Sequence, residues 1–233
     1  MDVETPKGRI SARAIIVTVS TNVLASGRIK FSPDLPRRHL DAASKLKLGV
    51  YERVALDMPS NPLGLAADDF VIEQSSGNKT AALLANVGGT PLCFVDVGGS
   101  FGQGLATQGQ KAMADFAVEW LTRLYGGDIR KAVRSTQSTQ WLKDPLVLGG
   151  WSSAAPGAQL ARRVLMEPLR DRVYFAGEAV HETAWGTVNG AWESGERAAE
   201  TALRKMGALK KDDPKVDQKR EPERRSRRRR NRS

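Results

Sequence analysis

The chain has little cysteine and little histidine. Its 233 residues include one cysteine, Cys93, and two histidines, His39 and His181. A single cysteine excludes an internal disulfide, and three such residues far apart in the sequence indicate no metal site. Cys93 lies in the apolar run Leu92 to Val97 and is expected to be buried as a small hydrophobic residue. His39 has charged neighbours on both sides and is expected to face solvent.

Long apolar runs are also absent. No stretch approaches the roughly 20 apolar residues that a membrane-spanning helix needs, and the first residues, Met1 to Glu4, do not resemble a secretory signal. Hydrophobic residues make up 40% of the chain, which is enough to bury a sizeable core at this length. We therefore expect a folded, soluble, cytoplasmic protein with no membrane partner.

The positive charge is concentrated at one end. The formal net charge is +10, and 14 Lys or Arg against 5 Asp or Glu lie from Arg204 onward. The segment 208–233 has no aromatic residue and few aliphatic ones, so we expect a disordered basic tail. Arginines of this kind contact phosphates, so one interpretation of the tail is weak nucleic-acid binding. The other interpretation is a solvated extension without a partner.

The rest of the chain alternates strand-like and helix-like segments, which predicts an α/β fold with α+β character. A helix is predicted from about Gln108 to Tyr125, another after Pro36, and a third from about Thr187 to Met206 with Gly207 as its stop. Close spacing of the strands between Tyr51 and Val97 predicts a mixed or antiparallel sheet. The strands are expected at 14–19, 51–58, 70–74, 80–86, 92–97 and 173–176.

The most informative stretch begins with the apolar run Val173 to Ala176. It continues through Gly177 and Glu178 into a glycine-spaced loop, and Gly186 and Thr187 then open the last predicted helix. Small residues on one helix face allow close packing, and the amides at the helix start attract an electron-rich group. This segment therefore predicts a place that holds a cofactor.

This stretch closely resembles the C-terminal signature of the FAD-dependent amine oxidases, the family that includes monoamine oxidases, polyamine oxidases, L-amino-acid oxidases and flavin histone demethylases. Further segments resemble the same family in the same order, over roughly residues 8 to 206. They are Ala14 to Ser20, Ile29 to Pro36, Gly49 to Leu56 and Gly149 to Gly157.

The resemblance implies a two-lobe fold and FAD-dependent oxidation of an amine to an imine, with oxygen as the usual electron acceptor. It places Gly177 and Glu178 along the ribityl and diphosphate part of FAD. It also places the amides of Gly186, Thr187 and Val188 near the flavin ring, where they would stabilise the reduced form. The flavin supplies the reactivity and the protein supplies position and charge.

Several positions depart from the family pattern. The family often has two aromatic side chains in front of the flavin; Trp151 matches one, whereas Thr187 occupies the other. Trp185 is the candidate replacement, so these three residues are expected to face substrate. Arg53 stands where the family tends to have a lysine near flavin N5. An arginine is no base, but it can orient water or a carboxylate, and the alternative for Arg53 is a surface ion pair.

Gly150 replaces the cysteine that holds FAD covalently in some members, so any flavin is expected to be noncovalent. The family's G-x-G-x-x-G turn is missing. The nearest imitation, Gly102 to Thr107, has threonine in place of the third glycine. We therefore expect the C-terminal part of a longer or split oxidase, whose partner is an N-terminal FAD-binding half. A nonenzymatic remnant is the alternative.

The resemblance also implies a division into domains. Residues 1–30 and 149–207 would belong to the FAD-binding lobe, 31–148 to the substrate-binding lobe, and 208–233 to the tail.

A serine hydrolase is the rival chemistry. Gly98 to Gly102 fits the G-x-S-x-G pattern around Ser100, and Asp144 and His181 follow in the order of an α/β-hydrolase triad. Because glycine-rich pentapeptides arise easily by chance and His181 lies within the flavin signature, we rank this interpretation below the oxidase. For His181 and Glu182 we expect a supporting role behind the substrate rather than catalysis.

Overall fold

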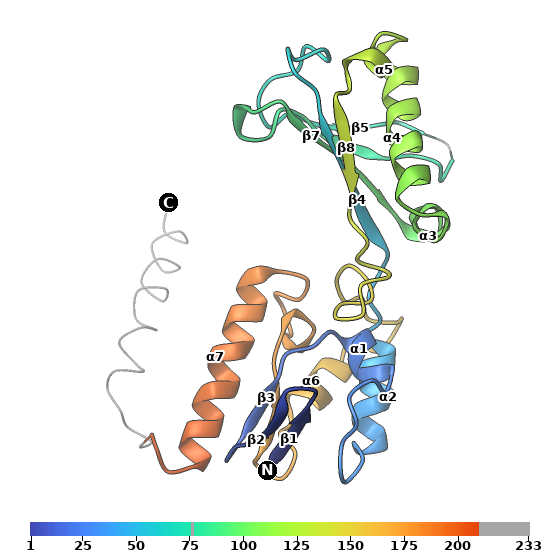
Figure 1. The fold of residues 1–233 in the computed structure, drawn as a ribbon. Coiled ribbons are helices and arrows are strands. Elements are labelled where there is room, and N and C mark those ends of the chain that lie inside the picture. Colours follow the sequence, from blue (N-terminus) through green and yellow to red (C-terminus); the bar gives the residue numbers. More distant parts are fainter. Residues whose placement is uncertain (76, 210–233) are drawn as a thin grey trace, which may run out of the picture.

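The computed structural model describes residues 1–75 and 77–209, so nearly all of the predicted basic tail lies outside the described residues. The chain forms two bodies joined by a narrow connection (Figure 1). We call residues 51–138 the sheet body, and residues 1–48 and 150–209 the helix body. Residues 139–149, called the connecting segment, lead from the sheet body back to the helix body.

The sheet body contains a five-stranded antiparallel sheet in the order β5-β6-β7-β4-β8. The strand spacing predicts a mixed or antiparallel sheet here and the antiparallel form is found, whereas the strand order and β8 were not predicted. Its three helices α3, α4 and α5 lie against one face (Figure 1). The elements are β4 (Tyr51–Asp57), β5 (Phe70–Ile72), β6 (Ala82–Leu84), η1 (Val87–Gly89), β7 (Leu92–Gly98), α3 (Gly99–Gln108), α4 (Gln110–Tyr125), α5 (Ile129–Ala132) and β8 (Ser135–Ser138).

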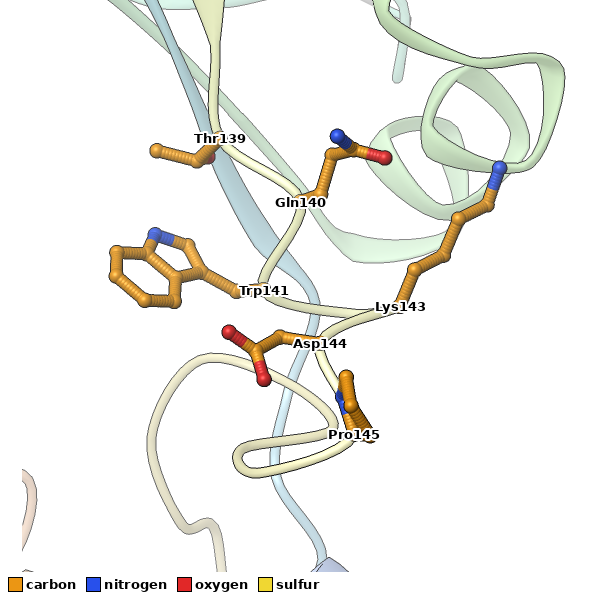
Figure 2. A pocket seen from close by; sticks show the side chains of 6 residues that line it. All are labelled: Thr139, Gln140, Trp141, Lys143, Asp144 and Pro145. Atoms are coloured by element: carbon orange, nitrogen blue, oxygen red, sulfur yellow. The ribbon is translucent and has the colours of Figure 1, made fainter.

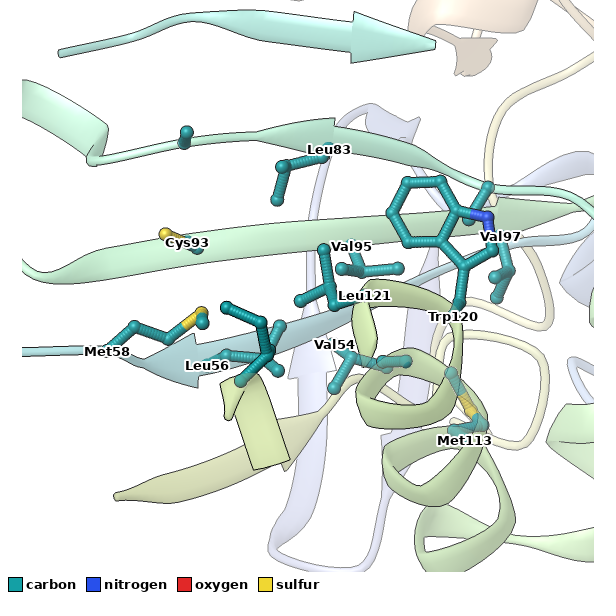
Figure 3. Packing of buried hydrophobic residues seen from close by; sticks show 14 of the residues in the cluster. Val54, Leu56, Met58, Leu83, Cys93, Val95, Val97, Met113, Trp120 and Leu121 are labelled. Atoms are coloured by element: carbon teal, nitrogen blue, oxygen red, sulfur yellow. The ribbon is translucent and has the colours of Figure 1, made fainter. Parts of the chain in front are cut away.

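Alternation along β4 and β7 determines which face is covered. Every second residue of both strands is buried, because successive side chains point to opposite faces. Trp120 and Leu121 of α4 pack onto this covered face, with Met113 two helical turns earlier (Figure 3). Cys93 is buried in the same core, as predicted. The opposite face of β4 and β7 remains half exposed and carries polar side chains.

The predicted helix from Gln108 is confirmed as α4, but α3 precedes it and was not predicted. Gly109 separates the two helices with a φ of 109°, a backbone conformation that favours glycine. The imitation of a dinucleotide turn, Gly102 to Thr107, lies inside α3. A Cβ on Gly102 would come within 3.1 Å of the Val97 backbone, so this glycine serves close helix–strand packing.

The helix body contains a two-stranded parallel sheet, β3 with β9, and the long helix α7 lies beside it (Figure 1). α2 packs against α1 and α6 in this body, although the domain division expected from the sequence assigns residue 31 onward to the other lobe. The elements are β1 (Asp2–Thr5), β2 (Gly8–Ser11), β3 (Ile15–Val17), α1 (Thr21–Ala25), α2 (Arg37–Lys45), α6 (Ala161–Met166), β9 (Val173–Phe175), η2 (Glu178–Val180) and α7 (Val188–Lys205).

The expectation that His39 faces solvent is wrong. Its side chain is fully buried, its Nε2 lies 3.3 Å from the carbonyl oxygen of Glu167, and its ring centroid lies 5.7 Å from that of Phe175. Helical periodicity explains the error, because His39 shares a face with the buried Ala42 and Ala43, three and four positions later. Its charged neighbours occupy the other faces of α2.

Burial of His39 predicts a loss of stability in acid. Desolvation lowers the pKa of His39 below its ordinary value of 6.5. As the pH falls through 6.5, the unfolded chain takes up this proton before the folded chain does, so the free energy of unfolding decreases, by at most about 1.4 kcal/mol per pH unit. Urea unfolding at about pH 7.5 and about pH 5.5 measures the effect. His39→Gln should show a smaller difference between the two pH values, and an unchanged difference would contradict the assignment.

Candidate flavin site

The site lies at the carboxyl ends of β3 and β9. These strands are parallel, so the residues that follow them meet at one edge, where ligands bind in open α/β sheets. A pocket of about 340 Å³ opens there. Its lining comes from the ends of both strands and the segments after them, from the connecting segment, and from α1, α6 and α7. It includes Val17, Thr18, Ser20, Gly150, Gly177, Glu178 and Ala191.

Glu178 joins three segments at this pocket. Its carboxylate accepts hydrogen bonds from the Ser152 amide at 2.9 Å, the Ser152 hydroxyl at 2.7 Å and the Gly186 amide at 2.9 Å. Gly177, with φ at 134°, turns the chain directly before it. The Gly186 amide is therefore committed to Glu178, although the sequence interpretation offers it to the flavin. Sequence reasoning also missed Ser152.

Thr187 is the N-cap of α7, so the helix begins within one residue of its predicted start. Its hydroxyl accepts from the Gly190 amide at 2.9 Å and donates to the Ala184 carbonyl at 2.8 Å. This cap satisfies the third amide of the helix and leaves those of Val188 and Asn189 for a ligand or water. The helix start directs partial positive charge outward, one helical turn before Ala191, the α7 residue that lines the pocket.

The two candidate tryptophans have different surroundings. Trp151 is 49% exposed, its ring centroid lies 4.7 Å from that of Tyr51, and it lies over Gly186, where a Cβ would be 3.4 Å from its ring. Trp185 instead covers the guanidinium of Arg162 at 5.0 Å. Trp151 therefore presents an open aromatic wall, whereas part of the Trp185 surface is used in packing.

Arg53 is held by the strand opposite. It is paired in register with Asp96, and its Nε and Nη2 donate to the two carboxylate oxygens at 2.6 and 2.8 Å. Its guanidinium lies 4.4 Å from the centroid of Phe94, and Nη2 donates to the Tyr51 hydroxyl at 3.0 Å. The Asp96 contact raises the pKa of Arg53, so it cannot act as a base. Asp96, an acidic residue in an otherwise apolar run, is a signal that sequence reasoning overlooked.

A second pocket, of about 390 Å³, lies on the connecting segment and was not predicted. Figure 2 shows Trp141 and Asp144 on one side of this segment, with Lys143 extending to the other. The Gly149 amide donates to the Trp141 carbonyl at 2.9 Å, so this pocket is adjacent to the segment that carries Trp151. An exposed aromatic ring beside a carboxylate is a surface that attracts cations.

The hydrolase triad is not assembled. Nε2 of His181 lies 2.8 Å from Glu193, and its Nδ1 accepts from the Ala184 amide at 2.8 Å. Both ring nitrogens are therefore engaged by groups other than Ser100 and Asp144. Ser100 is the second residue of α3 in the sheet body, and Glu182 pairs with Arg163. His181 supports the loop before α7, which fits the expected supporting role.

The part of the chain that the structure describes contains neither a metal site nor a membrane-spanning helix. Within the described ranges, 1–75 and 77–209, no group of three or more His, Cys, Asp or Glu residues is placed to hold a metal ion. In the same ranges no helix is both long enough and apolar enough to cross a membrane.

A pocket at the ends of parallel strands, beside an exposed helix start, defines an α/β protein of the nucleotide- or flavin-binding kind. Residues 2–203 match the family model of the flavin containing amine oxidoreductases. The chain therefore belongs to the flavin-containing amine oxidoreductase family, which uses FAD.

Curated relatives and a solved structure agree with this membership. Lysine-specific histone demethylase 1 homolog 2 of Arabidopsis thaliana is 32% identical over 82% of this chain and 27% of its own length. Polyamine oxidase 2 of the same plant is 30% identical over 81% of this chain and 38% of its own. Cyclohexylamine oxidase from Brevibacterium oxydans IH-35A has the same fold, with a TM-score of 0.73 at 20% identity over 88% of this chain and 46% of that one.

The α/β fold class is thus confirmed, and the chain spans about a quarter of the length of the first curated relatives that it matches. The residues at the pocket fit a flavin. Gly177 allows close approach of the backbone, and the start of α7 provides amides. Cys93, the sole cysteine, is buried in the sheet body, so it cannot link a flavin at this pocket.

Proposed function

We propose that this chain takes part in the FAD-dependent oxidation of an amine to an imine. The observation that carries the proposal is the pocket at the ends of β3 and β9, whose lining includes Gly177 and Glu178 within the segment that matches the family. When bound, noncovalently, FAD would accept the hydride equivalent from the carbon next to the amine. Oxygen is the expected final acceptor.

The residues of this chain would bind the flavin, orient the substrate and shield the site. Glu178 and Gly177 would lie along the ribityl and diphosphate part, and the amides of Val188 and Thr187 would stabilise negative charge on the reduced ring. Trp151 would form one wall of the substrate space. Arg53, with two nitrogens committed to Asp96, would use the exposed part of its guanidinium to orient water or substrate.

The proposal includes a nucleotide-binding half that completes the site. Parallel sheets are normally larger and covered on both faces, yet β3 and β9 form a pair whose Ile16 and Phe175 direct their backbone groups away from the partner strand. Beside this pair, Val188 and Trp192 of α7 are 88% and 69% exposed. We infer that a further unit adds strands beside this pair, completes an FAD-binding lobe and covers α7. The division into an FAD-binding and a substrate-binding lobe is proposed with α2 on the FAD-binding side, because α2 packs against α1 and α6.

The substrate is proposed to be a cationic amine. Trp141 and Asp144 line the second pocket, and ammonium groups bind favourably to aromatic faces and carboxylates. Aromatic amines, polyamines and amino acids all fit this chemistry. The demethylase relatives add lysine side chains of proteins as a fourth candidate class.

The test measures protein-bound flavin first and amine oxidation second. The chain is purified alone and after coexpression with the nucleotide-binding half of a related amine oxidase, and the visible absorbance of oxidised flavin is recorded. We expect the half to raise flavin content towards one per chain, and an amine from one of the four classes to bleach the flavin without oxygen. Flavin absent from both preparations would refute the site, and flavin that no amine bleaches would refute the reaction.

Thr187→Pro provides the site-specific test. Proline removes the hydroxyl that caps α7 and cannot adopt the φ of −120° found at this position. We expect loss of flavin retention. Thr201→Ala in the same helix, where the hydroxyl donates only to the Arg197 carbonyl, should leave flavin content unchanged. Full flavin content in Thr187→Pro would show that the helix start is not the site.

The cytoplasmic location and nucleic-acid binding by the basic tail rest on the sequence alone, and both stay predictions.

A further inference from the structure

Arg162 is buried behind the flavin site with part of its guanidinium unpartnered. Its side chain on α6 is fully buried, and Nη1 donates to the Ser152 hydroxyl at 3.0 Å and to the Ala179 carbonyl at 2.9 Å. Nε and Nη2 are buried, and neither has a hydrogen-bond partner within residues 1–75 and 77–209. An arginine in such a place costs more free energy than an apolar residue of the same size, so a role in packing alone does not account for it.

The contacts of Arg162 connect it to each segment of the site. The Ser152 hydroxyl donates to Glu178, so one hydroxyl bridges the guanidinium and the carboxylate. The same carboxylate accepts from the Gly186 amide, and the Trp185 ring covers the guanidinium at 5.0 Å. Moving Arg162 would therefore move Ser152, next to Trp151, and the loop that leads to Thr187.

The charges of Glu178 and Arg162 also support a role for Arg162 in the flavin site. Glu178 would bring a carboxylate close to a cofactor that becomes more negative on reduction, which by itself disfavours the reduced state. Arg162 supplies a cation on the opposite side of Ser152 and offsets that charge. Burial lowers the pKa of Arg162, and the charge of Glu178 opposes this shift.

We propose that Arg162 is a positioning residue of the flavin site, which fixes Ser152 and the Trp185 loop and balances the charge of Glu178. The inference rests on the proposed function for its effect on flavin, but not for its effect on the loop. It assigns to α6 a part in the site that no sequence motif indicates.

The test compares Arg162→Met with Arg163→Met, its exposed neighbour on the same helix, which pairs with Glu182 at the surface. The first readout needs no flavin. Acrylamide quenching of Trp185 is obtained as the difference between each protein and its Trp185→Phe counterpart. We expect Trp185 to be clearly more accessible in Arg162→Met and unchanged in Arg163→Met, because only the former loses the buried cation beneath the ring.

The second readout uses the flavin-loaded complex with the nucleotide-binding half. Arg162→Met should bind flavin about tenfold more weakly, as is typical when a group that orients a ligand-binding side chain is removed. Its bound flavin should also have a more negative reduction potential. Arg162→Lys keeps the charge, so its potential should stay near that of the unaltered protein, which a purely structural role would not require. If Arg162→Met fails to fold, Arg162→Lys takes its place in the quenching and flavin measurements.

The outcomes separate the two proposals. If Arg162→Met matches Arg163→Met in Trp185 quenching, the positioning role is wrong whether or not flavin binds. If quenching changes while the unaltered complex takes up no flavin, the proposed function is wrong and the positioning of the loop stands. Equal potentials for the Met and Lys variants would refute the charge-balancing role.

Discussion

Replacing Gly190 with alanine is expected to separate the 181–187 loop from α7 and to abolish flavin retention. A Cβ at this position would lie 2.0 Å from the carbonyl oxygen and 2.8 Å from the carbonyl carbon of Ala184. These are backbone atoms, which cannot rotate away as the end of a flexible side chain can. The helix and the loop must therefore move apart.

The loop carries the residues on which the site depends. Its separation from α7 would break the hydrogen bond from the Thr187 hydroxyl to the Ala184 carbonyl and displace the Gly186 amide from Glu178. Forced overpacking of this kind costs about 3 kcal/mol. Urea unfolding measures the stability, and absorbance of the flavin-loaded complex measures retention.

Gly195→Ala is the matched control, because Gly195 lies in the same helix and a Cβ there would meet nothing within 4 Å. Alanine in a helix interior is about 0.5–1 kcal/mol more favourable than glycine, so this variant should be slightly more stable and keep its flavin. If Gly190→Ala unfolds at the same urea concentration as the unaltered chain and retains flavin, the close contact between the loop and α7 is wrong.

Sequence patterns predicted the elements that follow from local periodicity. α7 has small residues at helical spacing between Thr187 and Gly207, and β4 and β7 are long alternating or apolar runs, so each was found close to its observed bounds. Shorter elements such as β1, β8 and α6 have no comparable signal and were missed. α3 was missed because it contains three glycines in ten residues, and glycine is a poor helix former.

The contacts that organise the site could not be predicted in the same way. Arg53 meets Asp96 only because of the register between β4 and β7, and Arg162 meets Ser152 only because the packing of α6 against η2 and α2 brings it beside the segment that follows Gly150. Such pairings depend on tertiary structure, which no spacing in the sequence encodes. His39 shows the converse error, since its charged neighbours hid a periodicity that places it in the core.

Glu52→Leu is expected to have the second large effect, because Glu52 holds the connecting segment to the sheet body. Its side chain is fully buried. It accepts from the Thr139 hydroxyl at 2.6 Å and from the amides of Trp141 and Leu142 at 3.1 and 2.9 Å. Leucine accepts nothing, so three donors in partly buried contacts lose their acceptor. A fully buried donor left without a partner costs about 1–3 kcal/mol, and a partly buried one costs less. We expect the free energy of unfolding to fall by about 3 kcal/mol or more.

Two variants on the same strand isolate this effect. Asp57→Asn removes a carboxylate that pairs with the exposed Arg134, and exposed pairs contribute at most about 1 kcal/mol, so its unfolding should change little. Glu52→Gln keeps the shape and one acceptor oxygen but presents an NH₂ group to the remaining donors, so its stability should lie between those of the unaltered chain and Glu52→Leu. Equal stability of Glu52→Leu and Asp57→Asn would contradict the assignment.

The same substitution tests how the second pocket is built. Trp141 belongs to the segment that Glu52 holds, and its carbonyl accepts from the Gly149 amide, two residues before Trp151. If Glu52→Gln keeps its fold, it should show altered Trp141 fluorescence and weaker amine binding than the unaltered chain. Its flavin content should change less than its amine binding. That separation would mean that β4 supports the substrate side of the site through Glu52 and presents Arg53 from its opposite face, whereas β9 and α7 hold the flavin.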